Sequence, residues 1–175
     1  MLTSNYLLSS LSSLKDFVSP AHQILQGDGY DGVIDILQNM RGVVYPCVVL
    51  EAGGSGSVSV VEGPVDTYTQ SLWVMGQLGR GEDEAQLFKD MKVLAMKVFA
   101  KLLQDKREGG HPEVDELDHQ RFTYMQRWGG PNARGYELVL TFRENYSLLL
   151  TTADFKPAPA PDPEPVTEPE TVQEG

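Results

Sequence analysis

The chain has 175 residues, of which 41% are hydrophobic and 22% are charged, and its formal net charge at pH 7 is −11. This composition is typical of a soluble globular domain with a real core, and its acidity argues against a protein that grips nucleic-acid phosphates. It does not exclude a protein that surrounds DNA without gripping it. No apolar run reaches the ~20 residues of a membrane span, and the N-terminus lacks a signal-peptide pattern. The single cysteine, Cys47, excludes an intrachain disulfide and suggests a reducing compartment.

Three helices are predicted in the first forty residues, over 3–18, 21–26 and 33–40. Thr3 or Ser4 can cap the first helix, whose leucines share one side. Ser19 followed by Pro20 is a typical start signal for the second helix. The glycines at Gly27–Gly29 predict a loop before the third.

Two extended segments and a flexible turn are predicted next. Val43–Glu51 is rich in β-branched residues and nearly continuous in apolar character, so both faces of this strand are expected to be buried. Because Pro46 cannot donate a ladder hydrogen bond, the strand should begin at an edge or a bulge. Ala52–Ser57 predicts a turn and Ser57–Glu62 a return strand. Extended structure resumes at Tyr68–Leu78, after Gly63 and Pro64.

The clearest element is a long helix over Glu82–Lys106. Its apolar residues recur at steps of three and four, and they form a face too wide for a two-stranded coiled coil. Acidic residues gather at its start, and Gly109–Gly110 marks its end. We therefore expect this helix to lie across a sheet.

An acidic connector over Gly109–His119 is predicted to lead into a closing hairpin. Its arms are Gln120–Trp128 and Gly135–Asn145, the second of which alternates with a period of two. The turn residues Gly129–Asn132 form the hairpin tip. Residues 146–150 extend this sheet or add a strand to it.

The sequence therefore predicts an α+β fold: a mostly antiparallel β-sheet with one long helix packed across a face and N-terminal helices. Residues 1–152 are predicted to form a single domain. Residues 153–175 are rich in proline and glutamate, and we interpret them as a disordered acidic tail, because they bury too little apolar surface to offset their ordering entropy.

Three groups of residues suggest chemistry, and each has a simpler explanation. Two histidines and four acids in the connector suggest a metal site, but they lack a fixed ligand spacing, and a solvated acidic loop explains them equally. These residues are His111, Glu113, Asp115, Glu116, Asp118 and His119. The glycines after Val43–Glu51 lack the Lys-Ser/Thr ending of a phosphate loop. Cys47 lies in an apolar strand, where a thiol is usually inert.

Aromatic residues suggest a recognition surface instead. Trp73, Tyr124, Trp128 and Tyr136 are candidates, although packing on the sheet is their commoner role. Trp128, beside the hairpin tip, is the best candidate for an exposed contact. We therefore predict no catalytic residue, cofactor or metal site, and we predict an interaction surface in two loop regions. Its residues are Gly53, Gly54, Ser55, Gly56, Trp128, Gly129, Gly130, Pro131, Asn132 and Arg134.

The order of elements resembles the tail terminator and head–tail joining proteins of long-tailed phages, the minor tail protein U-like family. An N-terminal helix precedes a strand of the type seen here as YPCVVLE, and a meander, a long helix and a final hairpin follow over about residues 3–150. The resemblance implies a ring, commonly of six copies, that caps the tail tube and joins it to neck proteins. DNA would pass through without specific binding, and the protein would be found in the virion and, during assembly, in the host cytoplasm.

Two other functions remain open. A small monomeric protein-binding or regulatory module would use the hairpin tip and the acidic connector. A metal-dependent hydrolase would use His111 and His119 with nearby acids. The acidic tail departs from the simplest plan of the resembled family, and it leaves open an extra contact or a solubilising end.

Overall fold

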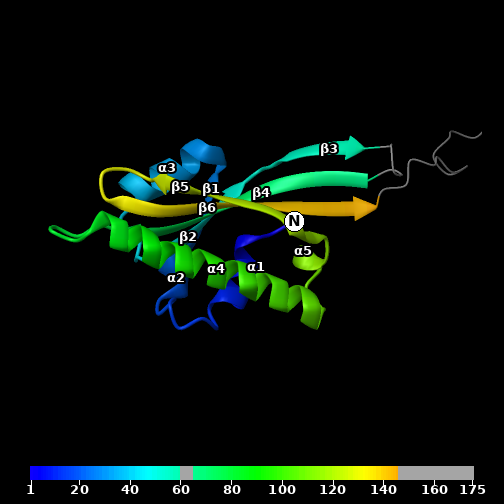
Figure 1. The fold of residues 1–175 in the computed structure, drawn as a ribbon, viewed down its shortest axis with the longest axis horizontal. Coiled ribbons are helices and arrows are strands. Elements are labelled where there is room, and N and C mark those ends of the chain that lie inside the picture. The colour runs from blue at the N-terminus through cyan, green and yellow to red at the C-terminus, as the bar shows by residue number, and fades with distance from the viewer. Residues whose placement is uncertain (60–64, 146–175) are drawn as a thin grey trace, which may run out of the picture.

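A computed structural model describes residues 1–59 and 65–145. A six-stranded, mostly antiparallel sheet forms the centre, with α4 across one face (Figure 1). The predicted α+β class is confirmed. The predicted strand over 146–150 and the acidic tail lie outside the described residues. The elements are α1 (Ser4–Leu11), α2 (Pro20–Gln23), β1 (Ile24–Asp28), α3 (Gly29–Asn39), β2 (Cys47–Ala52), β3 (Ser55–Ser59), β4 (Val65–Gln77), α4 (Glu84–Glu108), α5 (Pro112–Asp115), β5 (Leu117–Trp128) and β6 (Ala133–Asn145).

The sheet has the strand order β1-β2-β4-β6-β5, and β3 pairs with β4 beyond the end of β2. Only the β1–β2 pair is parallel among these strands. Figure 1 places α1, α4 and α5 on one face and α3 on the other. The larger core lies beneath α4 and α1, and a smaller one lies beneath α3 around Cys47, Val49 and Trp73. Both faces of β2 are therefore buried, as its apolar sequence predicts.

The long helix α4 closely matches its prediction. The side chain of Asp83 accepts a hydrogen bond from the backbone N–H of Ala85, and Gly109 ends the helix with a φ of 74°. Its apolar face packs on β4 and β6, where Leu94, Ala95 and Val98 are buried. A left-handed residue after the last turn favours glycine, which explains the stop at this point.

The first helix is shorter than predicted and ends at Leu11. Thr3 caps it, as expected, by accepting from the N–H of Tyr6. The hydroxyls of Ser12 and Ser13 donate to the carbonyls of Ser9 and Ser10. Such local bonds give the backbone an alternative to the helix, so the serines compete with its continuation.

A buried carboxylate ties α1 to α4. Asp105 accepts a hydrogen bond from the Tyr6 hydroxyl at 2.8 Å and another from the Ser10 hydroxyl. Lys101 forms an ion pair with the same carboxylate at 2.5 Å. Burial by itself raises the pKa of Asp105, but the hydrogen bonds from Lys101, Ser10 and Tyr6 outweigh it and hold the pKa below its usual value.

The predicted second helix and the following loop are wrong in part. Only Pro20–Gln23 is helical, and Ile24–Asp28 is strand β1 in parallel register with β2. A five-residue strand carries little periodic signal, so the pairing with β2 overrides local preference. Gly27 lies inside this strand opposite Glu51, and a Cβ there would lie 2.5 Å from the backbone N of Val33, so the close approach of α3 requires a glycine. The third helix forms as predicted but begins earlier, at Gly29.

The strand predicted over Val43–Glu51 begins only at Cys47, directly after Pro46. The turn is also shorter than Ala52–Ser57, because β3 already begins at Ser55. Moreover, β3 does not return along β2 but pairs with β4, so that Ser55 lies opposite Thr69. Local sequence indicates a strand here without indicating which strand lies beside it.

The closing hairpin forms as predicted between β5 and β6. The connector before it is more structured than expected: α5 occupies Pro112–Asp115, and β5 begins at Leu117 rather than Gln120. The register between β5 and β6 shifts between Leu117 and Phe122. This irregularity moves the intervening residues out of the ladder and leaves Phe122–Trp128 as the regular part of β5.

A candidate interaction surface along β5

The last strand of the sheet order, β5, has an outer edge with which no other described strand pairs. Its regular part, Phe122–Trp128, is bonded to β6 on the inner edge only. An edge strand of this kind presents unpaired N–H and C=O groups that another chain can use. The β5 edge is therefore a candidate surface for protein association.

Aromatic side chains follow this edge on the α4 side of the sheet. The ring of Phe122 stacks on Phe99 at a centroid distance of 3.9 Å, and Trp128 meets Phe88 edge-on at 5.4 Å. Tyr124 and Trp128 nevertheless remain 43% and 55% exposed. Rings that are anchored on one side and open on the other supply contact area at low entropic cost.

The flank of α4 beside these rings is basic. The ammonium of Lys92 lies over the Tyr124 ring, 4.9 Å from its centroid. Lys89 precedes Lys92 by three residues, and Arg107 follows Lys89 by eighteen residues, which is five helical turns, so the three lie along one flank of the helix. All three are exposed, and Lys92 brings positive charge to the aromatic edge.

The opposite face of β5 carries Met125, which is 41% exposed, and Arg127. Arg127 forms an ion pair with the buried carboxylate of Glu137 at 2.5 Å. The Ser71 hydroxyl donates to the same carboxylate at 2.7 Å. Arg127 is thus engaged within the sheet, whereas the thioether of Met125 is available to a partner. We call the outer edge of β5, with Tyr124, Met125, Trp128, Arg121 and the basic stripe Lys89, Lys92 and Arg107, the β5 surface.

The hairpin tip divides into exposed and internal residues. Trp128, Pro131 and Asn132 are exposed. Gly129 is buried, and a Cβ there would lie 2.5 Å from a methyl carbon of Leu37. The tip therefore rests on α3, and only part of the predicted loop faces solvent.

An ion pair joins the tip to the start of α4. The guanidinium of Arg134 donates to Glu84, and the indole N–H of Trp128 donates to the same carboxylate at 3.3 Å. These hydrogen bonds, that of Arg134 above all, hold the pKa of Glu84 below its usual value. Arg134 also donates to the carbonyl of Gly130 at 2.8 Å. Arg134 thus orients Trp128 and the tip, while most of its own surface is covered.

The other predicted loop, Gly53–Gly56, lies far from the tip. Its residues are exposed, and the Ser55 hydroxyl is 3.1 Å from that of Thr69. Ser55 lies opposite Thr69 on β4, whereas Ala133 lies opposite Gln77. At ~3.3 Å per residue the two loops are separated by about 26 Å along β4. The structure therefore does not join them into one surface.

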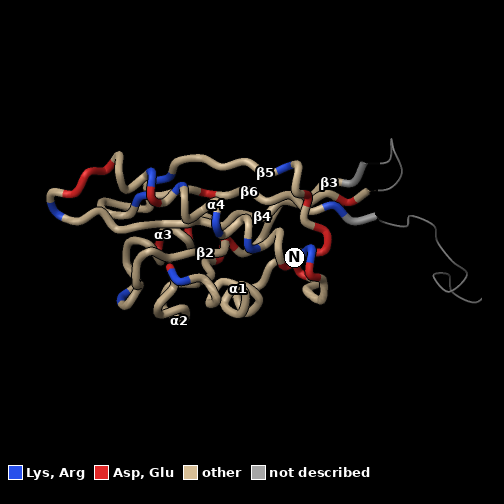
Figure 2. Tube along the Cα trace, turned by 60° about the horizontal axis from the view of Figure 1, so that its bottom comes forward, with Lys and Arg blue, Asp and Glu red and all other residues tan. Residues whose placement is uncertain are grey.

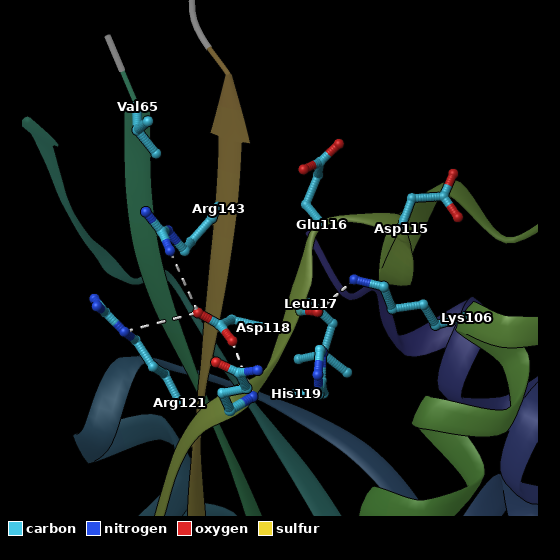
Figure 3. Close-up of a pocket in the computed structure, with 10 residues that line it drawn as sticks. Val65, Lys106, Asp115, Glu116, Leu117, Asp118, His119, Arg121 and Arg143 are labelled. Carbon is cyan, nitrogen blue, oxygen red and sulfur yellow. Dashed lines mark hydrogen bonds and ion pairs between the residues drawn. The ribbon is translucent and has the colours of Figure 1, made fainter. Parts of the chain in front are cut away.

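A depression of about 470 Å³ lies beside the irregular part of β5 (Figure 3). Arg121 and Arg143 both point toward Asp118, at 3.8 and 4.0 Å. The ammonium of Lys106 donates to the carbonyl of Leu117 at 2.6 Å. Two of the three cations thus share one carboxylate and the third binds the backbone. The cations that line the depression therefore link α4, β5 and β6 to one another.

The connector residues do not form a metal centre. His111 lies against the Tyr6 ring at 5.7 Å, while His119 lines the depression. Among the described residues no three His, Cys, Asp or Glu side chains are placed to hold a metal ion. Cys47 is fully buried, and burial raises the pKa of its thiol to about 12, so a reactive thiolate is disfavoured. Trp73 and Tyr136 are also buried, as parts of the two cores.

Sequence reasoning singled out Trp128 and Tyr124, which are exposed in the structure, but it did not single out the basic stripe of α4. The stripe is visible in the sequence, because lysines and arginine fall on one side of the helix, yet its meaning depends on which flank meets β5. None of the described helices has both the length and the apolar composition that a membrane crossing requires. No protein-family model matches the chain, and no curated protein matches it either.

Proposed function

We propose that the protein assembles with copies of itself into a ring that caps a phage tail tube and joins it to the head. The observation that carries this proposal is the β5 surface, where an unpaired strand edge coincides with exposed Tyr124, Met125 and Trp128. A monomer that kept this edge exposed would risk unspecific pairing, so an edge of this kind favours a defined neighbour. The resemblance in element order to tail terminators supplies the ring and its place in the virion.

The charge of the chain supports passage of DNA through such a ring. The formal net charge is −11, so the field around an assembly of several copies would repel phosphates. The cations of the β5 surface would be used between the copies rather than presented to DNA. This arrangement suits a lumen through which DNA slides without binding.

The test is assembly of the purified full-length chain, followed by light scattering and by electron microscopy. We expect rings with a central hole, alone or on purified phage tail tubes. Met125→Lys should weaken assembly at least ~10-fold, because an added lysine on an edge strand opposes strand pairing. Val18→Lys is the control, since Val18 is 80% exposed and lies between α1 and α2, outside the β5 surface.

A chain that stays strictly monomeric, both alone and with tail tubes, would refute the proposal. A stable 1:1 complex with a soluble protein, without rings, would instead identify a monomeric binding module. If Met125→Lys and Val18→Lys assembled equally well, assembly would not use the β5 surface.

A further inference from the structure

We infer that the protein binds a sugar ring through two neighbouring hydroxyls, in a depression at the start of α3. The depression has a volume of about 400 Å³, and its lining includes Gly29, Glu51, Ser55, Thr69 and Ser71. None of the residues that line it belongs to the β5 surface. The inference therefore stands independently of the proposed ring.

The depression lies at the carboxyl ends of two parallel strands. β1 leads through α3 into β2, and Asp28 lies opposite Ala52 where both strands end. In open sheets built from such βαβ units, ligands bind in the crevice outside the carboxyl ends of the strands. Gly29, the first residue of α3, and Glu51 of β2 both line the depression. The topology thus places it where this kind of unit holds a ligand.

One face of the sheet forms the floor of the depression. Successive side chains of a strand alternate between the two faces. Glu51 therefore shares the face of Val49, and Thr69 and Ser71 share the face of Trp73. α3 packs on Val49 and Trp73, which are fully buried, whereas the three polar side chains beyond them are only half-buried. The floor is thus polar and open to solvent next to the helix.

The carboxylate of Glu51 is held in a fixed direction. The indole N–H of the buried Trp73 donates to its Oε2 at 3.2 Å. A carboxylate can accept roughly four hydrogen bonds, so this contact leaves most of its capacity for a ligand. An acid at the end of the second strand of a βαβ unit is also the group that accepts from ribose hydroxyls in dinucleotide-binding domains. Glu51 is accordingly the residue that would accept from two neighbouring sugar hydroxyls.

Hydroxyls and an aromatic ring complete the site. The Ser55 hydroxyl lies 3.1 Å from that of Thr69, and the Ser71 hydroxyl donates to Glu137. Because the proton of Ser71 is used in this way, its oxygen is left to accept from a ligand. Tyr30 follows Gly29 in α3 and is 52% exposed. Its ring can cover the apolar C–H side of a sugar, as aromatic residues in ligand sites do.

The charge around the depression disfavours a phosphate. Asp28, Asp31 and Asp35 are the charged residues of β1 and α3, which carry no lysine or arginine (Figure 2). Among the described residues that line the depression, Glu51 alone is charged. A helix N-terminus supplies roughly half a positive charge, which is less than the two negative charges of Asp28 and Asp31 at the same end. The site therefore favours an uncharged ligand.

Three glycines at this point have the spacing of a dinucleotide-binding loop. Gly27, Gly29 and Gly32 fit the G-x-G-x-x-G pattern between a strand and a helix. Packing explains two of them without a ligand, because a Cβ on Gly27 would lie 2.5 Å from the N of Val33, and one on Gly32 would lie 3.1 Å from the carbonyl carbon of Gly27. The pattern alone thus does not identify a dinucleotide, whose phosphates the nearby acids would repel.

Saturation-transfer NMR on the full-length chain tests the inference with three probes: methyl α-D-glucopyranoside, methyl β-D-ribofuranoside and adenosine. We expect at least one to bind with a Kd of about 1 mM or below. Glu51→Gln should weaken that binding ~10-fold or more, because hydrogen bonds to a charged acceptor are stronger than those to a neutral one. Its amide oxygen can still accept from Trp73, so the fold should be kept. Glu116→Gln, at an exposed acid that lines the other depression, is the matched control and should bind as the wild type does.

The choice of probes separates the possible sources of the diol. Binding of a glycoside alone would identify a free saccharide, and binding of adenosine alone would identify a nucleoside; either result supports the site. Equal binding by wild type and Glu51→Gln, or by a probe and a deoxy analogue without neighbouring hydroxyls, would overturn it. Tighter binding of adenosine monophosphate than of adenosine would overturn it in favour of a phosphate site. If no probe bound at ~10 mM, the inference would fail and the proposed ring would be unaffected.

Discussion

The two flanks of α4 differ in how fully the fold uses their side chains. On the flank that meets α1, the buried Asp105 is bonded to Tyr6, Ser10 and Lys101. On the flank that meets β5, Tyr124 and Trp128 contact Lys92 and Phe88 of α4 and are still 43% and 55% exposed. One helix thus closes the core on one side and supports an open surface on the other. Substitutions on the first flank should change folding, and those on the second should change assembly.

The largest effect is expected where the two flanks meet, at the centre of the buried face. Val98→Asp or Leu94→Asp should unfold the protein, with a loss above ~4 kcal/mol, because either change buries an unpaired charge. Both side chains are nearly inaccessible. Circular dichroism during thermal unfolding measures the effect. A variant that stayed folded and lost only assembly would make this face an interface instead.

A smaller loss is expected on the closed flank. Asp105→Asn should destabilise the protein by about 2–3 kcal/mol at pH 7, because it removes the charge that Lys101 faces in a buried setting. The control is Asp16→Asn, since Asp16 pairs with the half-exposed Lys97 and should contribute less than ~0.5 kcal/mol. Urea unfolding of both variants gives the comparison. Equal losses would show that the α1–α4 connection does not depend on this charge.

The same carboxylate predicts the dependence of stability on pH. The folded-state pKa of Asp105 lies below its usual value, so its contribution is complete above the unfolded pKa of about 4. It is lost as the pH falls through the folded pKa. The difference in unfolding free energy between wild type and Asp105→Asn should therefore narrow in acid, and a difference that stayed constant would contradict the assignment.

The smallest effect on stability is expected on the open flank. Tyr124→Ala should cost about 1 kcal/mol or less, because the ring is 43% exposed and packs only in part. Its effect on assembly should be larger, about 10-fold or more, since exposed aromatic residues often dominate interfaces. Thermal unfolding and light scattering on one sample separate the two. A variant with lower stability but unchanged assembly would place Tyr124 in the core rather than at the interface.

Local patterns predicted some parts of the candidate surface and not others. Trp128 could be singled out because it stands beside turn residues, and it is exposed in the structure. Gly129 and Arg134 have the same local context, yet the first lies against Leu37 and the second pairs with Glu84. These contacts join residues that are 50 or more positions apart, and no local pattern encodes them.

The sequence by itself determined α4, the β5–β6 hairpin and the two-sided burial of β2. In each case the information is local: a helical period with its caps, an alternation around a turn, and a continuous apolar run. Tertiary structure alone decided that Ile24–Asp28 is a strand, that β3 pairs with β4, and that β5 forms an edge. The physical reason is that a strand gains its hydrogen bonds from a neighbour elsewhere in the chain. The whole sheet therefore decides that β5 is an edge strand, and so decides where the candidate surface lies.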